Sequence, residues 1–279
     1  MYIIVPVHNR FQYTKRFLES LYCQTDRSFK VIIVDDGSTD GTAKNIQLLY
    51  PDIKILSGDG NLWWTASINL GIKYALSKNP KYILTLNNDT IVPSDFIEKM
   101  KYWAKIKPEA ILGSLAVNVT TGEVVFAGEA INWKFAKFDN YLDNLDPDSY
   151  QGLREVTHLP GRGMLIPVDV INNIGLFDEK NLPHYGADYD FSLRAANYGY
   201  DIYCNYDSKL LTYPDESGSV YLRNRKNIKN YYLHLFGIKG GGNLKDFYYI
   251  AKNNCPKKYF IPFLFFGFIR RIGGYWLKN

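Results

Sequence analysis

The sequence predicts an α/β fold with a mostly parallel central sheet and helices on both faces. In roughly the first 120 residues, short apolar runs of β type alternate with segments of helical spacing. Strands joined by helices of this length form a parallel sheet with helical crossovers. The composition supports a folded, soluble protein with a sizeable core, because 46% of the residues are hydrophobic and 22% are charged.

The individual elements follow from the apolar pattern and from the cap residues. The predicted strands are Tyr2–Val7, Val31–Val34, Ile53–Leu56, Tyr82–Leu86, Met164–Val168 and Tyr200–Tyr203. The predicted helices are Phe11–Tyr22, Ala43–Tyr50, Thr65–Leu76, one that Pro93 opens, a short one after Val168 and one that ends at Gly199. From Ile111 to Tyr150 the pattern loosens into short apolar stretches and turns.

Polar residues follow two of the predicted strands directly. Asp35 and Asp36 end one strand, and Asn87, Asn88 and Asp89 end another. The carboxyl ends of parallel strands face the crevice where ligands bind. Carboxylate and amide oxygens suit a hard divalent cation. Each group alone also fits a plain turn, since Asn and Asp are common turn formers.

A third polar cluster runs from His184 to Arg194. Asp188 and Asp190 lie at a predicted helix start, where the helix dipole stabilises carboxylates. Asp190 and Arg194 have the i,i+4 spacing of an ion pair, so Asp190 is the structural acid of the two and Asp188 the chemical one.

The absent motifs narrow the function further. The chain has no Gly-x-Gly-x-x-Gly after its first strand and no Gly-Lys-Ser/Thr phosphate loop, which weakens dinucleotide and ATP binding. Cys23, Cys204 and Cys255 have neither CxxC nor metal-ligand spacing, so we expect reduced thiols in a cytoplasmic protein without a signal peptide.

Five sequence segments, taken in order, resemble family 2 glycosyltransferases with the GT-A (Rossmann-like) fold. They are Val5-Pro-Val-His-Asn9, Val34-Asp-Asp-Gly-Ser-Thr-Asp-Gly41, Gly60-Asn-Leu-Trp-Trp-Thr-Ala-Ser-Ile-Asn-Leu-Gly71, Leu86-Asn-Asn-Asp89 and Gly186-Ala-Asp-Tyr-Asp190 with Arg194. The resemblance covers about residues 2 to 225. The Asn-Asn-Asp-Thr and Gly-Asn segments are also similar to those of rhamnosyltransferase-like bacterial enzymes.

The resemblance implies an inverting transfer of a sugar from a nucleotide-diphosphate donor, a UDP-hexose or dTDP-rhamnose, to an acceptor hydroxyl. Asp188 matches the catalytic base, and Asp89 would hold Mg²⁺ or Mn²⁺ against the diphosphate. The expected donor-binding residues are Pro6, Asn9, Asp35, Asp36, Asn61, Trp63, Trp64, Asn69, Asn87, Asn88 and Arg162. The expected acceptor-side or supporting residues are His184, Asp190, Arg194 and Asp215.

Several of these assignments have a plain structural alternative. Trp63 and Trp64 could stack on a sugar or pack in the core. Arg162 could contact the diphosphate or belong to a simple loop, and His184 could take part in the site or be structural. Two departures from the family pattern also matter. Asn87 is neutral where many relatives have Asp, and the stretch near Asp215 and Glu216 lacks the His that helps relatives hold the metal or diphosphate.

We predict a catalytic domain over residues 1–225, with a nucleotide-binding half (1–117) and an acceptor half (118–225), and a helical extension over 226–279. The run Tyr259–Ile269 is apolar and flanked by Lys257-Lys258 and Arg270-Arg271. It is too short to span a bilayer, and its basic and aromatic residues suit the interface of an anionic membrane. Packing on the catalytic domain or on a second subunit is the alternative.

The favoured function is therefore sugar transfer in the synthesis of a cell-surface polysaccharide. We expect the enzyme at the cytoplasmic face of the membrane, with a glycan or lipid-linked acceptor. Self-association is left open. A sugar nucleotidyltransferase is the alternative enzyme, although His8-Asn9-Arg10 is a poor triphosphate loop. A non-catalytic binding protein with a decayed site is the alternative outside enzymes. Nucleic acid is not favoured, because the apolar run of the tail is too continuous for such a surface.

Overall fold

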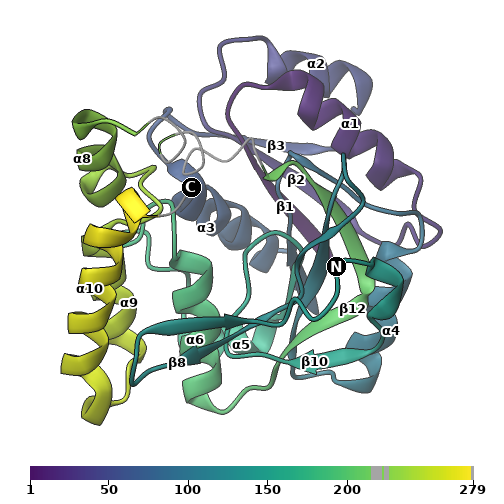
Figure 1. Ribbon diagram of the computed structural model, residues 1–279. Helices are drawn as coiled ribbons and strands as arrows, with labels where there is room; N and C mark the ends of the chain where they lie inside the picture. The colour runs from purple at the N-terminus through teal and green to yellow at the C-terminus, as the bar shows by residue number, and fades with distance from the viewer. Residues whose placement is uncertain (215–221, 223–225, 278–279) are drawn as a thin grey trace.

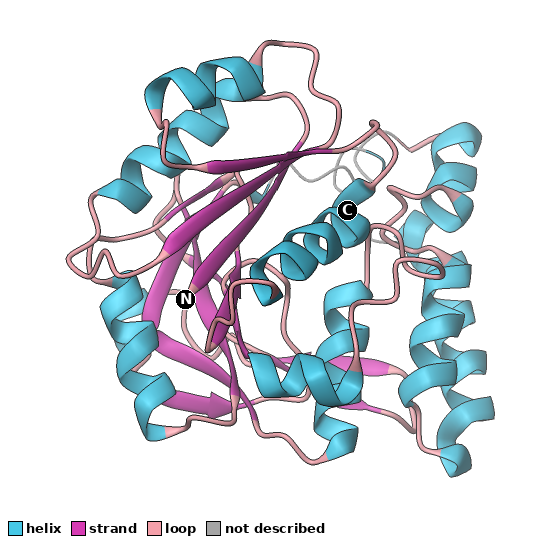
Figure 2. Ribbon diagram, turned by 180° about the vertical axis from the view of Figure 1, so that it is seen from behind, coloured by secondary structure: helices cyan, strands magenta, loops and turns pink. Residues whose placement is uncertain are grey.

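A mixed sheet flanked by helices forms the centre of the computed structural model, which describes residues 1–214, 222 and 226–277 (Figures 1 and 2). The strands are β1 Tyr2–Val7, β2 Lys30–Asp35, β3 Lys54–Ser57, β4 Tyr82–Thr85, β5 Thr90–Ile91, β6 Ile111–Asn118, β7 Val124–Phe126, β8 Glu129–Asn132, β9 Lys137–Asn140, β10 Leu153–Glu155, β11 Met164–Pro167 and β12 Ile202–Thr212. The α-helices are α1 Phe11–Tyr22, α2 Thr42–Leu49, α3 Trp63–Leu76, α4 Phe96–Ile106, α5 Val168–Ile174, α6 Ala187–Tyr198, α8 Ile228–Phe236, α9 Leu244–Asn254 and α10 Phe260–Leu277.

The main sheet has the order β10-β12-β6-β11-β4-β1-β2-β3. Strands β1 to β4 are parallel where they pair, and β6 and β12 are parallel to each other. Strand β11 is antiparallel to both of its neighbours, β4 and β6. The predicted α/β fold with a mostly parallel sheet is therefore confirmed. Its consequence for function is that β1, β2 and β4 all end at the same edge.

Most predicted elements agree with the structure to within two residues, but two do not. The prediction that Pro93 opens a helix is wrong, because α4 begins at Phe96. The Pro93 and Ser94 carbonyls instead accept hydrogen bonds from Gln24 and Thr25, which dock this loop onto the end of α1. The short strand predicted at Tyr200–Tyr203 is part of the much longer β12, which runs on to Thr212 along β6.

The C-terminal extension packs on the helix that carries Asp188. Helices α8, α9 and α10 lie together at one side of the molecule, and α9 contacts α6 (Figure 1). The fully buried Asp190 accepts hydrogen bonds from Arg194 at 2.8 Å, from Asn253 at 2.9 Å and from Asn254 at 2.8 Å. The predicted Asp190–Arg194 ion pair is confirmed, and the same carboxylate joins α6 to α9.

Helix α10 buries one face, with Phe263, Gly267 and Tyr275, and the β8–β9 hairpin also contacts it. The rings of Trp133 and Phe263 lie 4.9 Å apart, and Arg270 donates to the Ala136 carbonyl at 2.6 Å. In the part of the chain that the structure describes, no helix is long and apolar enough to cross a membrane.

We expect Asp190→Ala to lower the free energy of unfolding by about 3 kcal/mol, because the partly buried Arg194 then lacks its counter-ion. Urea denaturation measures the change. The matched control is Asp95→Ala, which removes the exposed i,i+4 pair with Lys99 at 2.6 Å and is expected to change stability by less than about 0.5 kcal/mol. Equal losses in the two variants would contradict the structural role of Asp190.

Candidate active site

The loops after β1 and β2 are joined by hydrogen bonds at the edge where these strands end. His8 Nδ1 lies 2.6 Å from the Asp36 carbonyl oxygen. The Asn9 backbone N–H donates to Ser38 Oγ at 2.7 Å, and Asn9 Oδ1 accepts from the Thr39 backbone N–H at 2.8 Å. Asn9 therefore shapes the edge of the site. Pro6 lies in β1 beyond the residues that pair with β4, so its missing N–H breaks no bond of that ladder.

The two aspartates at the end of β2, Asp35 and Asp36, are both nearly buried, and both accept backbone hydrogen bonds. Asp35 Oδ1 accepts from Ser38 at 3.0 Å. Asp36 uses both oxygens, one for the Gly60 N–H at 2.8 Å and one for the Trp63 N–H at 3.0 Å. Asp36 thus holds the loop that leads into α3. Asn61 lies in this loop, and its side chain is exposed.

Trp63 begins α3 with a positive φ of 57°, a conformation that a bulky residue adopts only where its surroundings hold it. Its ring lies 5.6 Å from the His184 ring, and Lys239 Nζ from the extension lies 5.6 Å from its centroid. Burial lowers the pKa of His184 to about 4, with a further contribution from the Lys239 ammonium, so this imidazole is neutral near pH 7. The extension therefore brings a cation to the rim of the site.

Trp64 connects β4 to the loop before β11. Its Nε1 donates to Asn87 Oδ1 at 3.0 Å. Because indole N–H is only a donor, the contacting atom of Asn87 is the oxygen and its NH₂ group is directed elsewhere. On the other side, a Cβ on Gly161 would lie 2.2 Å from Trp64 Cζ2, so only glycine allows this approach. Asn87 is thus oriented as a hydrogen-bond donor.

Asp188 is brought to this junction from α6. Its Oδ2 accepts the Gly161 N–H at 2.8 Å, and the Gly161 carbonyl accepts from Thr85 Oγ1 at the end of β4 at 2.5 Å. Burial raises the pKa of Asp188 above its usual value, although the Gly161 and Tyr189 N–H groups oppose the shift. A desolvated carboxylate with a raised pKa is a stronger general base near neutral pH.

Asn88 and Asp89 turn toward the first helix. Asn88 Nδ2 donates to Thr14 Oγ1 at 2.9 Å. Asp89 lies 3.7 Å from Arg10, whose guanidinium stacks 4.2 Å from the Tyr13 ring centroid. Among the described residues, no three His, Cys, Asp or Glu side chains gather as a metal site. Mg²⁺ is commonly held by one or two carboxylates together with substrate phosphates, and Asp89 fits that kind of site.

Arg162 lies between Gly161 and Gly163 and is half-buried. Its Nε has no hydrogen-bond partner in the described part of the chain. Gly163 has a φ of 78°, and a Cβ there would lie 2.4 Å from Ser114 Oγ. The paired glycines therefore let this loop dock on β4 and β6, and Arg162 lies in the same loop as Gly161, which bonds Asp188.

Asn69 has a role other than the expected one, Asp190 and Arg194 have the expected supporting role, and Asp215 lies outside the described residues. Asn69, expected beside the donor sugar, is buried and bonds the Phe177 backbone and Glu179 Oε2, so it fixes the loop after α5. Asp190, paired with Arg194, fixes α6 against α9 on the side of the helix away from Asp188. Asp215 lies outside the residues that the structure describes.

His158 and Glu129 were missed because they lie in or just after the stretch without a clear pattern. His158 is fully buried, its Nε2 lies 3.2 Å from Glu129 Oε2, and its ring lies 4.1 Å from that of Tyr189. Lys239 was missed as well, since only the packing of α8 and α9 places it near Trp63.

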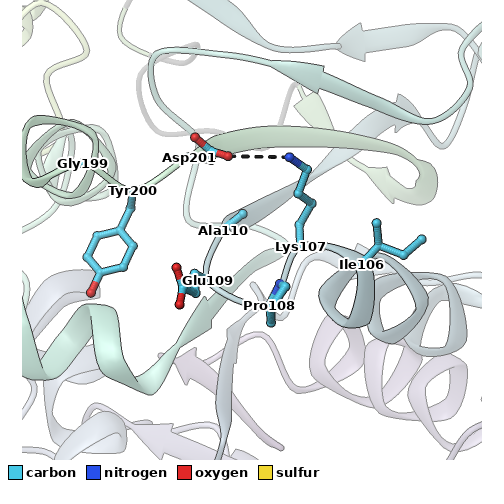
Figure 3. Close-up of a pocket in the computed structure, with 8 residues that line it drawn as sticks. All are labelled: Ile106, Lys107, Pro108, Glu109, Ala110, Gly199, Tyr200 and Asp201. Atoms are coloured by element: carbon cyan, nitrogen blue, oxygen red, sulfur yellow. Dashed lines mark ion pairs between the residues drawn. The ribbon is translucent and has the colours of Figure 1, made fainter.

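The hollow shown in Figure 3 lies away from this site. It has a volume of about 240 Å³ and is lined by residues just before β6 and β12, with an ion pair of 3.7 Å between Lys107 and Asp201. It therefore opens at the amino ends of these strands, and the candidate site lies at the carboxyl ends.

The mixed α/β fold, with its central sheet between helices, is that of the GT-A glycosyltransferases. The chain belongs to glycosyl transferase family 2, whose model matches residues 2–152; a second model, glycosyl transferase family group 2, matches residues 82–232.

Individual proteins agree with this assignment. An uncharacterized glycosyltransferase of Haemophilus influenzae is 26% identical over 90% of this chain and 81% of its own length. An N-acetylglucosaminyl-diphospho-decaprenol L-rhamnosyltransferase of Mycobacterium tuberculosis is 31% identical over 24% of this chain and 22% of its own length.

Solved structures share the fold at low identity. Staphylococcus aureus TarS (residues 1–349) superposes with a TM-score of 0.59 and 13% identity over 100% of this chain and 91% of its own. GalNAc-T7 with UDP, GalNAc and Mn²⁺ superposes with a TM-score of 0.62 and 14% identity over 76% of this chain and 42% of its own.

We expect Trp64→Phe to lower kcat/KM about tenfold with little change in thermal stability, because it removes the hydrogen bond that orients Asn87 but keeps an aromatic ring beside Gly161. Trp103→Phe is the control, since its Nε1 donates to Asp207 at 2.8 Å away from the site. The role of Trp64 is contradicted if both variants retain full activity.

Proposed function

We propose that this glycosyltransferase moves a sugar from a nucleotide diphosphate to an acceptor hydroxyl with inversion at the anomeric carbon. The observation that supports this most is the placement of Asp188. It is a desolvated carboxylate bonded to the Gly161 N–H, and Trp64 connects Gly161 to Asn87 at the end of β4.

In the proposed step, Asp188 takes the proton of the acceptor hydroxyl while the oxygen of that hydroxyl bonds to the anomeric carbon. The bond from that carbon to the diphosphate oxygen breaks at the same time, and the nucleoside diphosphate leaves with the electron pair. A single displacement inverts the configuration. The NH₂ group of Asn87 and the guanidinium of Arg162 are the donors that we assign to hydroxyl or phosphate oxygens of the substrates.

Asp89 is the residue that would hold Mg²⁺ or Mn²⁺. The metal supplies charge neutralisation for the departing diphosphate. Arg10 already balances the Asp89 carboxylate in part, so the site accepts a cation only if this side chain shares or yields its contact.

For the donor we propose dTDP-rhamnose or a UDP-hexose. The first is supported by the similarity to the mycobacterial rhamnosyltransferase, and the second by the fold shared with GalNAc-T7, which was solved with UDP. For the acceptor we propose a lipid-linked glycan at the cytoplasmic face of a membrane, in polysaccharide synthesis. Lys239 beside Trp63 is a cation that such a phosphate-bearing acceptor would meet.

The proposal is tested by thermal shift with UDP, dTDP, GDP, their sugars and the matching triphosphates, and by nucleotide release from the sugars, each with Mg²⁺ or Mn²⁺. We expect stabilisation by one nucleotide that depends on metal in the wild type and is lost in Asp89→Ala. Asp188→Asn is expected to keep this stabilisation but to lower transfer at least about a hundredfold.

Two results would contradict the proposal. Stabilisation by nucleoside triphosphates in preference to diphosphates would favour a nucleotidyltransferase. Full transfer activity in Asp188→Asn would remove Asp188 as the base.

A further inference from the structure

Helix α10 exposes a continuous apolar stripe. Ile261, Phe265, Ile269, Ile272 and Trp276 recur at the three- and four-residue spacing of one helix face, and each is 45 to 71% exposed. We call these five residues the apolar face. Helix α8 packs on the end of α10, with the Tyr231 and Trp276 rings 5.3 Å apart, and it also exposes Ile228 and Tyr232.

The buried side of α10 is apolar as well, so the helix has apolar residues on both sides. Phe263 packs on Phe247 of α9 with ring centroids 4.9 Å apart, and Gly267 lies against the same ring. A helix of a water-facing surface carries polar residues on its outer side. The apolar face therefore requires a nonpolar environment of its own.

The charge of the extension identifies that environment. Residues 226–279 contain ten Lys and Arg and one acid, so the other 225 residues have a net charge of −4 in a chain of net charge +5. The one acid, Asp246, is nearly buried, and burial raises its pKa to about 7. The extension thus presents cations around an apolar stripe.

Basic residues also gather where α9 ends and α10 begins. A hollow of about 320 Å³ is lined there by Lys252, Cys255, Lys257 and Phe260. An anionic headgroup is attracted by the two ammonium groups, and the aromatic ring suits the boundary between headgroups and acyl chains.

We propose that the apolar face lies in the interface of an anionic lipid bilayer, with α10 parallel to the membrane plane. A second copy of this chain would meet the same excess of positive charge, whereas an anionic lipid surface complements it. The inference rests on the proposed function only in that a lipid-linked acceptor requires the enzyme at a membrane. Lys239, in the loop between α8 and α9, would then join the bound surface to Trp63 in the site.

Vesicle co-sedimentation of the full chain tests this surface. We expect binding to phosphatidylglycerol–phosphatidylcholine vesicles and weaker binding to phosphatidylcholine alone. Ile261→Asp is expected to reduce the partition coefficient at least about tenfold. The matched control is Leu48→Asp on α2, which lies away from α10 (Figure 1). Leu48 and Ile261 are both 71% exposed. Lys257→Glu with Lys258→Glu is expected to abolish the preference for anionic vesicles.

Three results would overturn the inference. The first is wild-type protein that binds neither kind of vesicle, and the second is an equal loss of vesicle binding in Leu48→Asp and Ile261→Asp. The third is a wild-type dimer that Ile261→Asp dissociates, since the apolar face would then join two copies. Nucleotide-dependent thermal stabilisation without vesicles is expected to be unchanged in Ile261→Asp. A missing nucleotide response in the wild type would instead count against the proposed function.

Discussion

The site depends on the close approach of Gly161 to Trp64. No side chain fits between them, and at this contact three parts of the fold meet: α3 through Trp64, β4 through Thr85 and Asn87, and α6 through Asp188. Each connection uses a hydrogen bond whose direction is set by chemistry, since indole and backbone N–H groups only donate and the Gly161 carbonyl, which Thr85 contacts, only accepts. The distance between the strand edge and the Asp188 carboxylate on α6 is therefore set by packing, which gives the preorganisation that the proposed base requires.

The second face of α6 connects the helix of the proposed base to the C-terminal extension. Asp188 faces the site, and two residues later Asp190 faces α9, where Asn253 and Asn254 satisfy one of its oxygens and Arg194 the other. The orientation of the proposed base thus depends on the helices of the extension, which also bring Lys239 near Trp63. The same helices carry the apolar face, so a membrane-bound extension would place the site at a set height above the lipid.

Much of the fold was predictable because it is local. Strands β1 and β2 are short apolar runs, helix α1 matches its predicted bounds, and Gly199 caps α6 with a φ of 111°. What failed depends on tertiary contacts: Pro93 lies in a loop that α1 holds, β12 is extended by pairing with β6, and Asn69 is satisfied by a loop more than 100 positions away. Motifs indicated the acids of the candidate site, but the Gly161–Trp64 contact and the His158–Glu129 pair have no signal in the sequence.

The pH dependence of kcat/KM tests the central claim, that the desolvated Asp188 carboxylate is the base, most directly. Because burial raises its pKa above the usual 3.8, activity must increase with pH through an acid limb that lies above this value and then reach a plateau. Asp188→Glu is expected to move that limb, while Asp35→Glu leaves it in place. A rate already at its maximum at pH 4, or a limb unaffected by Asp188→Glu, would contradict the account.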